Sequence, residues 1–187
     1  SVNIANKIID DPSIITVMGS YSSSCSMAAA PVFEKAKMFF YSPTASHPDF
    51  PALGDYIVSQ SLDINYKMTA MMRDTYKLFD GKDCAIIYQN TDHGVVSTEA
   101  AAKVWEENGS KVLASEPFVS GSTKDFAPLV SKVAEKNPGI LMINAAYNDA
   151  AAIMFAIDRL GLRDKMEVVH IGSVLVDEFK NIVGTQG

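Results

Sequence analysis

The feature that most constrains the fold is a regular alternation between short apolar runs and longer stretches with helical spacing. The apolar runs predict buried strands at residues 14–19, 38–41, 56–61, 84–88, 112–118, 140–144 and 168–172. Helical spacing predicts helices at residues 2–10, 26–37, 63–79, 94–108, 123–136, 148–160 and 176–183. Strands that alternate with helices of this length imply an α/β fold with parallel sheets and right-handed crossovers. Because the strands are continuous apolar runs, we expect both faces of each sheet to be covered.

The composition narrows the range of partners. A formal net charge of -6 and a pI near 5.0 argue against a nucleic-acid partner, since phosphate binding needs a basic patch. No apolar stretch reaches the ~18 residues of a spanning helix, so we expect no membrane insertion in this segment. The two cysteines, Cys25 and Cys84, are expected to be buried thiols. No signal peptide is visible at Ser1, which leaves the location open.

Two polar loops follow neighbouring predicted strands. The run GSYSSSCS, residues 19–26, leads from the first strand into a helix, whose N-terminus offers free backbone N–H groups and a positive dipole end. The run SPTASHP, residues 42–48, follows the next strand and opens a proline-rich loop that extends to residue 55. Helix capping and a proline-stabilised turn are the structural alternatives. If the loops converge, their hydroxyl and backbone groups form a site for a polar solute.

The stretch VMGSYSSSCSMAAAPVFEKAKMFFYSPTASHPDF resembles the first-lobe signature of branched-chain amino-acid-binding proteins, which are type I periplasmic solute-binding proteins of ABC transporters. The segments KDCAIIYQNTDHG, STKDFAPLVSKV and NPGILMINAAYND are similar to successive second-lobe elements. The resemblance implies two doubly wound parallel-sheet lobes that close on a solute, with residues 1–61 as a partial first lobe and residues 62–187 as most of the second. It also implies a truncated central fragment, with material absent at both ends.

Position by position, the resemblance assigns roles to five residues. Ser23 would donate its hydroxyl to the carboxylate of the solute, Ala45 would offer backbone groups, and Ser46 would offer a hydroxyl and a backbone N–H. From the second lobe, His93 occupies the aromatic position before Gly94, and Tyr147 occupies the tyrosine position after the strand at 140–144. Tyr21 directly follows a strand end, and we therefore expect it to line the cleft as well.

The sequence departs from the family at one point that bears on the ligand. Such proteins usually supply a carboxylate for the ammonium of the solute after the strand at residues 168–172. Here the chain reads Gly172-Ser173-Val174, without an acid. A buried ammonium without a partner is costly, so either another acid replaces it or the solute lacks an amine. The replacement candidates are Asp92, Asp149 and the more distant Asp177.

No motif for catalysis, a metal or a cofactor is present. The three histidines are scattered, no nucleotide-binding glycine motif occurs, and no serine–histidine pair is evident from spacing. We therefore expect no enzymatic activity, no cofactor and no metal. The leading hypothesis is the periplasmic or membrane-anchored extracellular binding component of an ABC importer, with a small solute and a membrane permease as partners. The alternative is a ligand-sensing domain of a receptor or transcription regulator with the same fold.

Overall fold

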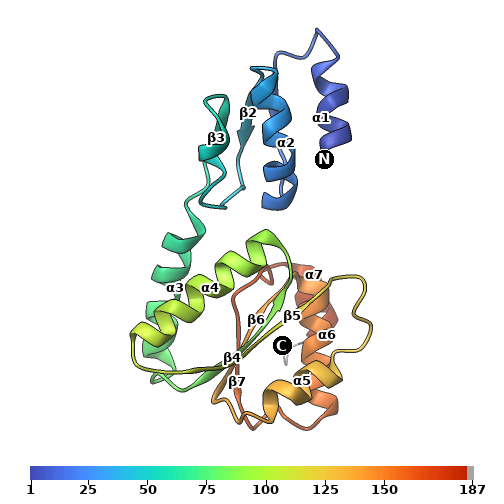
Figure 1. Ribbon diagram of the computed structural model, residues 1–187. Helices are drawn as coiled ribbons and strands as arrows, with labels where there is room; N and C mark the ends of the chain where they lie inside the picture. The colour runs from blue at the N-terminus through green and yellow to red at the C-terminus, as the bar shows by residue number, and fades with distance from the viewer. Residues whose placement is uncertain (185–187) are drawn as a thin grey trace. The chain divides into compact units, whose positions relative to one another are not determined.

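Two separate parallel sheets organise the chain, as the alternating pattern predicts. The computed structural model describes residues 1–184, which form two compact units (Figure 1). The first unit comprises Ser1–Met68 together with Thr91–Ser97. The second comprises Thr69–Asn90 together with the chain from Thr98 onward. The predicted division at residue 61, which concerns the lobes of a whole binding protein, stays a prediction.

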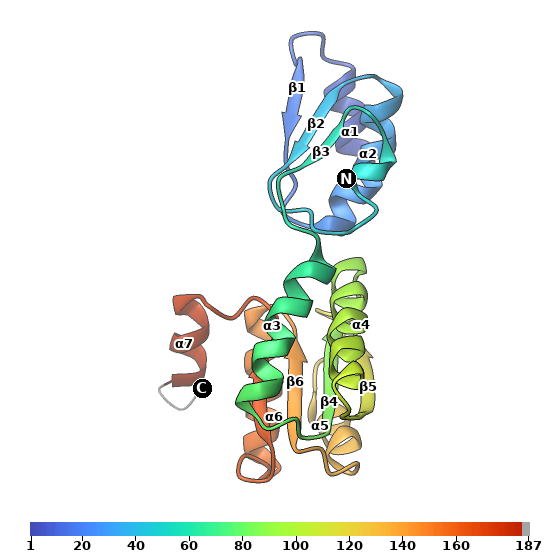
Figure 2. The same ribbon diagram turned by 90° about the vertical axis from the view of Figure 1, so that its left-hand side faces the viewer.

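The first unit is built on a sheet of three parallel strands. These are β1 (Thr16–Met18), β2 (Phe39–Ser42) and β3 (Ile57–Ser59), in the order β1-β2-β3. Helices α1 (Val2–Ile9) and α2 (Ser23–Lys35) lie along one face of it (Figure 2). Phe40 is buried between that face and the helices, with its ring 4.8 Å from Phe33 and 5.8 Å from Phe50. The proline-rich loop contains a short 3-10 helix, η1 (Pro51–Leu53).

The other face of this sheet is open to solvent in the described chain. Alternate residues of a strand point to opposite faces, and Val17, Phe40 and Ile57 point towards the helices. Met18 and Phe39 lie on the opposite face and are 75% and 44% exposed. The prediction that the first strand is buried on both faces was therefore wrong. An apolar run shows that residues suit a covered sheet, but it does not show what covers them.

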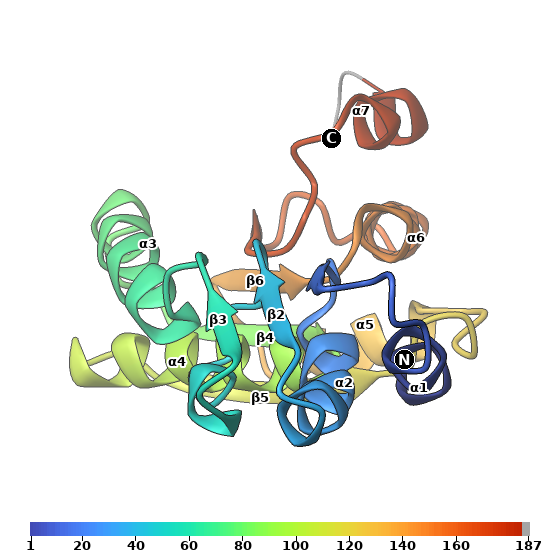
Figure 3. The same cartoon turned by 90° about the horizontal axis from the view of Figure 1, so that it is seen from above.

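The second unit contains a sheet of four parallel strands in the order β5-β4-β6-β7. The strands are β4 (Cys84–Gln89), β5 (Val112–Phe118), β6 (Ile140–Asn144) and β7 (Glu167–His170). Helices α3 (Ile64–Leu78) and α4 (Asp92–Glu107) lie side by side over one face (Figure 2). Helices α5 (Ala127–Ala134) and α6 (Tyr147–Arg159) cover the opposite face, and α7 (Asp177–Val183) packs against α6 (Figure 3).

The two central strands of the second unit meet the expectation of burial on both faces. All five residues of β6 are buried, as are the first four of β4. Trp105, in α4, is fully buried. It donates its indole N–H to the carbonyl of Lys82 at 2.9 Å and packs edge-on against Tyr76. Trp105 is thus a packing residue.

The two cysteines differ in environment. Cys84 is buried at the start of β4, and burial raises the pKa of its thiol to about 12. Cys25 is exposed, so the prediction that it is buried was wrong. It lies in the first turn of α2 between the buried residues Ser23 and Ser26, and this places it on the opposite side of the helix.

Candidate functional site

Two polar loops meet at the carboxyl edge of the first sheet. β1 and β2 are adjacent and parallel, with Val17 beside Phe40 and Met18 beside Tyr41. Their carboxyl ends therefore lie together, and the loops that follow them emerge side by side. The loop after β1 leads into α2, whose first residue is Ser23, and the loop after β2 carries Ser46.

A group of hydroxyl residues ties these loops together. The Ser20 backbone N–H donates to Ser26 Oγ at 3.3 Å, and the Ser42 hydroxyl donates to the Ser20 carbonyl at 3.3 Å. The Thr44 hydroxyl reaches the carbonyls of Ser20 and Tyr21, each at 3.0 Å. Ser26 and Ser42 are both fully buried. These bonds hold the two loops in register, which is the structural role of the serine-rich run.

Ser23 and Ser46 form a buried hydroxyl pair at the start of α2. Each is 4% exposed, and the Ser46 backbone N–H donates to Ser23 Oγ at 3.3 Å. A hydroxyl carries one hydrogen and two lone pairs. Within residues 1–184, Ser23 Oγ accepts from Ser46, so its hydrogen remains available to an incoming oxygen. The first turn of α2 adds free N–H groups and the positive end of the helix dipole beside this pair.

Ala45 lies next to Ser46, but its backbone groups are engaged inside the protein. Its N–H donates to Ser42 Oγ at 3.1 Å, and its carbonyl accepts from the Ser59 hydroxyl at 2.6 Å. The side chain is buried in the core of the first unit. A backbone contact from Ala45 to a solute stays a prediction, and it would have to use the second lone pair of the carbonyl.

His93 joins the hydroxyl pair from the first turn of α4. The segment Thr91–Ser97 clusters with the first unit, and His93 Nδ1 lies 3.4 Å from Ser46 Oγ. Which of the two atoms donates depends on the tautomer of the ring. Although His93 is exposed as a residue, the protein around its ring displaces enough water to lower its pKa, and the positive charge of Lys67 lowers it further. The imidazole is therefore neutral at pH 7.

The two predicted tyrosines lie outside this cluster. Tyr21 is 79% exposed, and its carbonyl, rather than its side chain, is what Thr44 contacts. Tyr147 belongs to the second unit, where it begins α6 and packs partly buried against the core between α6 and the sheet. The structure thus brings Ser23, Ala45, Ser46 and His93 together. The roles of all six predicted residues in binding stay predictions.

In the second unit, the turn after β7 is tightly packed and carries no acid. Ser173 forms a β-bridge with Ala146, and a Cβ on Gly172 would lie 2.1 Å from the Ala145 carbonyl oxygen. Val174 packs partly buried against the core of this unit. Glycine at position 172 is thus required by the close approach of the Ala145 backbone.

Two of the three candidate replacement acids have partners within the protein. Asp149 Oδ2 accepts from the Ser120 hydroxyl at 2.6 Å, and Asp177 forms an ion pair with Lys180 at 3.4 Å. Asp92 is exposed in the first turn of α4, immediately before His93.

Sequence reasoning missed the groups that surround the hydroxyl pair. Ser42 and Ser59 bind the backbone of Ala45, and Lys67 contributes a positive charge near His93. The serine at the end of β2 was recognisable, because polar residues at the carboxyl ends of parallel strands mark sites. Lys67 gave no such signal, since a single lysine in a helix is usually a solvated side chain.

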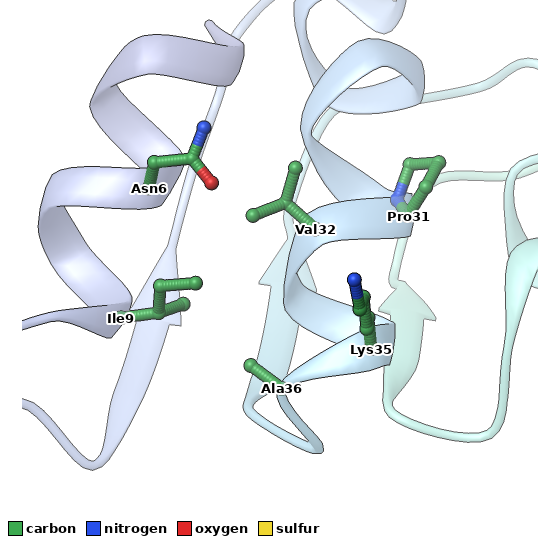
Figure 4. A pocket seen from close by; sticks show the side chains of 6 residues that line it. All are labelled: Asn6, Ile9, Pro31, Val32, Lys35 and Ala36. Atoms are coloured by element: carbon green, nitrogen blue, oxygen red, sulfur yellow. The ribbon is translucent and has the colours of Figure 1, made fainter.

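Other features of the described residues offer no competing site. Among residues 1–184, no group of histidine, cysteine, aspartate or glutamate side chains could hold a metal ion. None of the helices in this part of the chain has both the length and the apolar character needed to cross a bilayer. A pocket of about 450 Å³ opens between α1 and the C-terminal half of α2 (Figure 4), and is lined by Asn6, Ile9, Pro31, Val32, Lys35 and Ala36.

Each unit is a parallel α/β sheet, and polar loops follow the carboxyl ends of its strands, where such sheets place their binding sites. The sequence model of the family described as "Periplasmic binding protein" matches residues 1–180, and the chain belongs to this family. The predictions of a type I periplasmic binding protein fold, and of a binding protein rather than an enzyme, are thereby confirmed at the level of the family.

Individual relatives are more distant. A leucine-, isoleucine-, valine-, threonine- and alanine-binding protein of Pseudomonas aeruginosa is 24% identical over 144 residues, which is 76% of this chain and 38% of that protein. A leucine-binding protein from Thermotoga maritima matches at a TM-score of 0.85 and 22% identity, over 98% of this chain and 52% of that one. A solute-binding protein from R. palustris in complex with 4-hydroxybenzoate matches at a TM-score of 0.85 and 19% identity, over 98% of this chain and 50% of that one. The chain thus spans about half the length of these proteins or less, and the structural likenesses show the fold.

Proposed function

We propose that the protein to which this chain belongs is the extracytoplasmic solute-binding component of an ABC importer, and that it binds a small solute through a carboxylate or similar polar head. The observation that carries this proposal is the buried Ser23–Ser46 pair at the start of α2, where two hydroxyls and the free N–H groups of a helix N-terminus lie together. Membership of the periplasmic binding protein family supports it.

The geometry suits an anionic or strongly polar oxygen. Ser23 can donate its hydroxyl hydrogen while its oxygen accepts from Ser46, which fixes the direction of that donation. The positive end of the α2 dipole favours negative charge at the same point. Hydrogen bonds to a charged group contribute roughly 1.5–3 kcal/mol each, about twice a neutral bond.

The rest of the proposal concerns the whole protein. Residues 1–61 would form part of the first lobe and residues 62–187 most of the second, with Tyr21, Ala45 and Tyr147 adding contacts to the solute. The family implies a periplasmic location, and a membrane permease would receive the loaded protein. The named ligands of the relatives, leucine and 4-hydroxybenzoate, indicate two chemical classes to test: amino acids and aromatic acids.

Titration calorimetry on the full-length protein tests the proposal with a panel of amino acids, aliphatic acids and 4-hydroxybenzoate. For the solute that binds tightest, Ser23→Ala should weaken binding roughly tenfold to a hundredfold, because ~1.4 kcal/mol corresponds to a factor of ten. Ser46→Ala should weaken it less, since the backbone N–H of residue 46 keeps its bond to Ser23 Oγ and still orients the Ser23 hydroxyl. Ser24→Ala, one residue further along the same helical turn, is the matched control and should leave the affinity unchanged. Equal affinity in wild type and Ser23→Ala would refute the site.

A further inference from the structure

A neutral imidazole and a lysine lie beside the hydroxyl pair. His93 Nδ1 lies 3.4 Å from Ser46 Oγ, and the positive charge of Lys67, from α3, acts on the ring. His47, from the loop after β2, also lies near, and its Nδ1 accepts the backbone N–H of Asp49 at 3.2 Å. Two acids are close in sequence, Asp92 beside His93 and Asp63 one turn before Lys67. Asp92 is exposed, and Asp63 Oδ1 accepts the backbone N–H of Asn65 at 2.6 Å.

These surroundings disfavour a further positive charge at the hydroxyl pair. Burial of the ring lowers the pKa of His93 and the charge of Lys67 lowers it further, so the ring is neutral near pH 7. Lys67 Nζ is held by the Ser61 hydroxyl at 2.7 Å, which anchors its charge on this side of the unit. A carboxylate seated on Ser23 and Ser46 would reverse the balance, because it would place a negative charge within reach of the imidazole.

We propose that His93 makes the site select solutes with a net negative charge, by taking up a proton from solvent as the carboxylate binds. The inference rests on the proposed function. The imidazolium then donates a charge-assisted hydrogen bond to the carboxylate. An α-ammonium group on the solute would add a second cation near Lys67, so amino acids are disfavoured relative to the corresponding acids without the amine.

Proton uptake gives the affinity a defined pH dependence. The pKa of His93 is low in the free protein and is raised by the bound anion. Between these two values the dissociation constant should rise with pH, by up to about tenfold per pH unit. Below the pKa of the free protein the ring is already protonated, and the affinity should become independent of pH.

The experiment uses matched solutes that differ only in the amine: 4-methylpentanoate and L-leucine, 3-phenylpropanoate and L-phenylalanine, propanoate and L-alanine, with 4-hydroxybenzoate added. Calorimetry on the full-length protein at pH 7, repeated in buffers of different ionisation enthalpy, counts the protons taken up. The acid of a pair should bind at least tenfold tighter than its amino acid. Binding of the acid should take up between about half a proton and one proton.

Variants of the three histidines assign the proton. His93→Gln should abolish the uptake and flatten the pH dependence, whereas His47→Gln and His170→Gln should retain both. The inference would be overturned if proton uptake persisted in His93→Gln or disappeared in His47→Gln alone. It would also be overturned if the amino acid bound more tightly than the acid in every pair. Binding of an acid without proton uptake refutes this inference and leaves the proposed function standing. Absence of binding by every solute of the panel refutes the proposed function, and this inference with it.

Discussion

Gly172→Ala should destabilise the second unit strongly, although it adds only one methyl group. A Cβ at this position would lie 2.1 Å from the carbonyl oxygen and 2.6 Å from the nitrogen of Ala145, where ordinary contacts are 3.4 Å or longer. Both atoms belong to the backbone, so a side-chain rotation cannot remove the clash. The backbone at the junction between β6 and β7 has to move apart by about 1 Å. That junction includes the bridge between Ala146 and Ser173 and the Ile171 N–H bond to Ile143.

Overpacking of a well-packed site costs about 1–3 kcal/mol, and we expect the upper part of this range because backbone must move. Urea unfolding of the full-length protein, followed by far-UV circular dichroism and by the fluorescence of Trp105, measures the change. Trp105 is the one tryptophan of this chain and reports on the second unit.

Gly54→Ala is the matched control. Its Cβ would lie even closer to a neighbour, at 2.0 Å, but that neighbour is the end of the flexible Glu34 side chain. Glu34 can move away and lose its bond to the Tyr56 N–H, at a cost of about 1 kcal/mol. A Gly172→Ala variant within about 0.5 kcal/mol of the wild type would refute the close backbone approach and the reasoning built on it.

Two further properties should follow from the described contacts. His170 packs edge-on against Phe179, and its buried Nδ1 has no hydrogen-bond partner in residues 1–184. Burial lowers the pKa of this ring. Because the pKa in the folded state lies below that in the unfolded state, the free energy of unfolding should decrease as the pH falls below about 6.5. Urea unfolding between pH 8 and pH 5 should show this decrease, and His93 should contribute to it. A combined His93→Gln, His170→Gln variant should make the free energy of unfolding depend less on pH. An unchanged pH dependence in this variant would contradict the role of the two histidines. Separately, β1 is an edge strand with Met18 exposed, so the chain as given should self-associate, and Met18→Lys should reduce the association measured by light scattering. A strictly monomeric chain at high concentration would count against this.

The sequence predicted the bounds of strands best where a run ends sharply at polar or turn residues. The bounds of β5 and β6 match the predicted residues 112–118 and 140–144. All of β6 is buried, whereas β5 is partly exposed up to the buried Phe118, and both strands end at or close to polar or turn residues. Helix α2 begins at Ser23 rather than at the predicted residue 26. Serine can either cap a helix or occupy its first turn, and the buried contact of Ser23 with Ser46, distant in sequence, favours the second arrangement here.

The chemistry of the site was only partly predictable. Adjacent parallel strands place the loops after β1 and β2 together, so the meeting of Ser23 with Ser46 follows from topology. The engagement of both Ala45 backbone groups by Ser42 and Ser59 depends on side-chain directions that no spacing rule gives. The positive charge near His93 comes from Lys67 of α3, and the two residues come together only when the chain is folded.

The first unit is discontinuous along the chain, and this affects the order in which its parts can fold during synthesis. Its last segment, Thr91–Ser97, follows β4, the strand around which the second sheet is arranged. Domains usually acquire structure as they leave the ribosome, from the N-terminus onward. Here residues 1–68 emerge without the turn that carries His93, and they must wait for roughly thirty more residues, a few seconds at ordinary rates of synthesis. During that interval Ser23 and Ser46 have already been synthesised, but the contact between Ser46 and His93 cannot yet form.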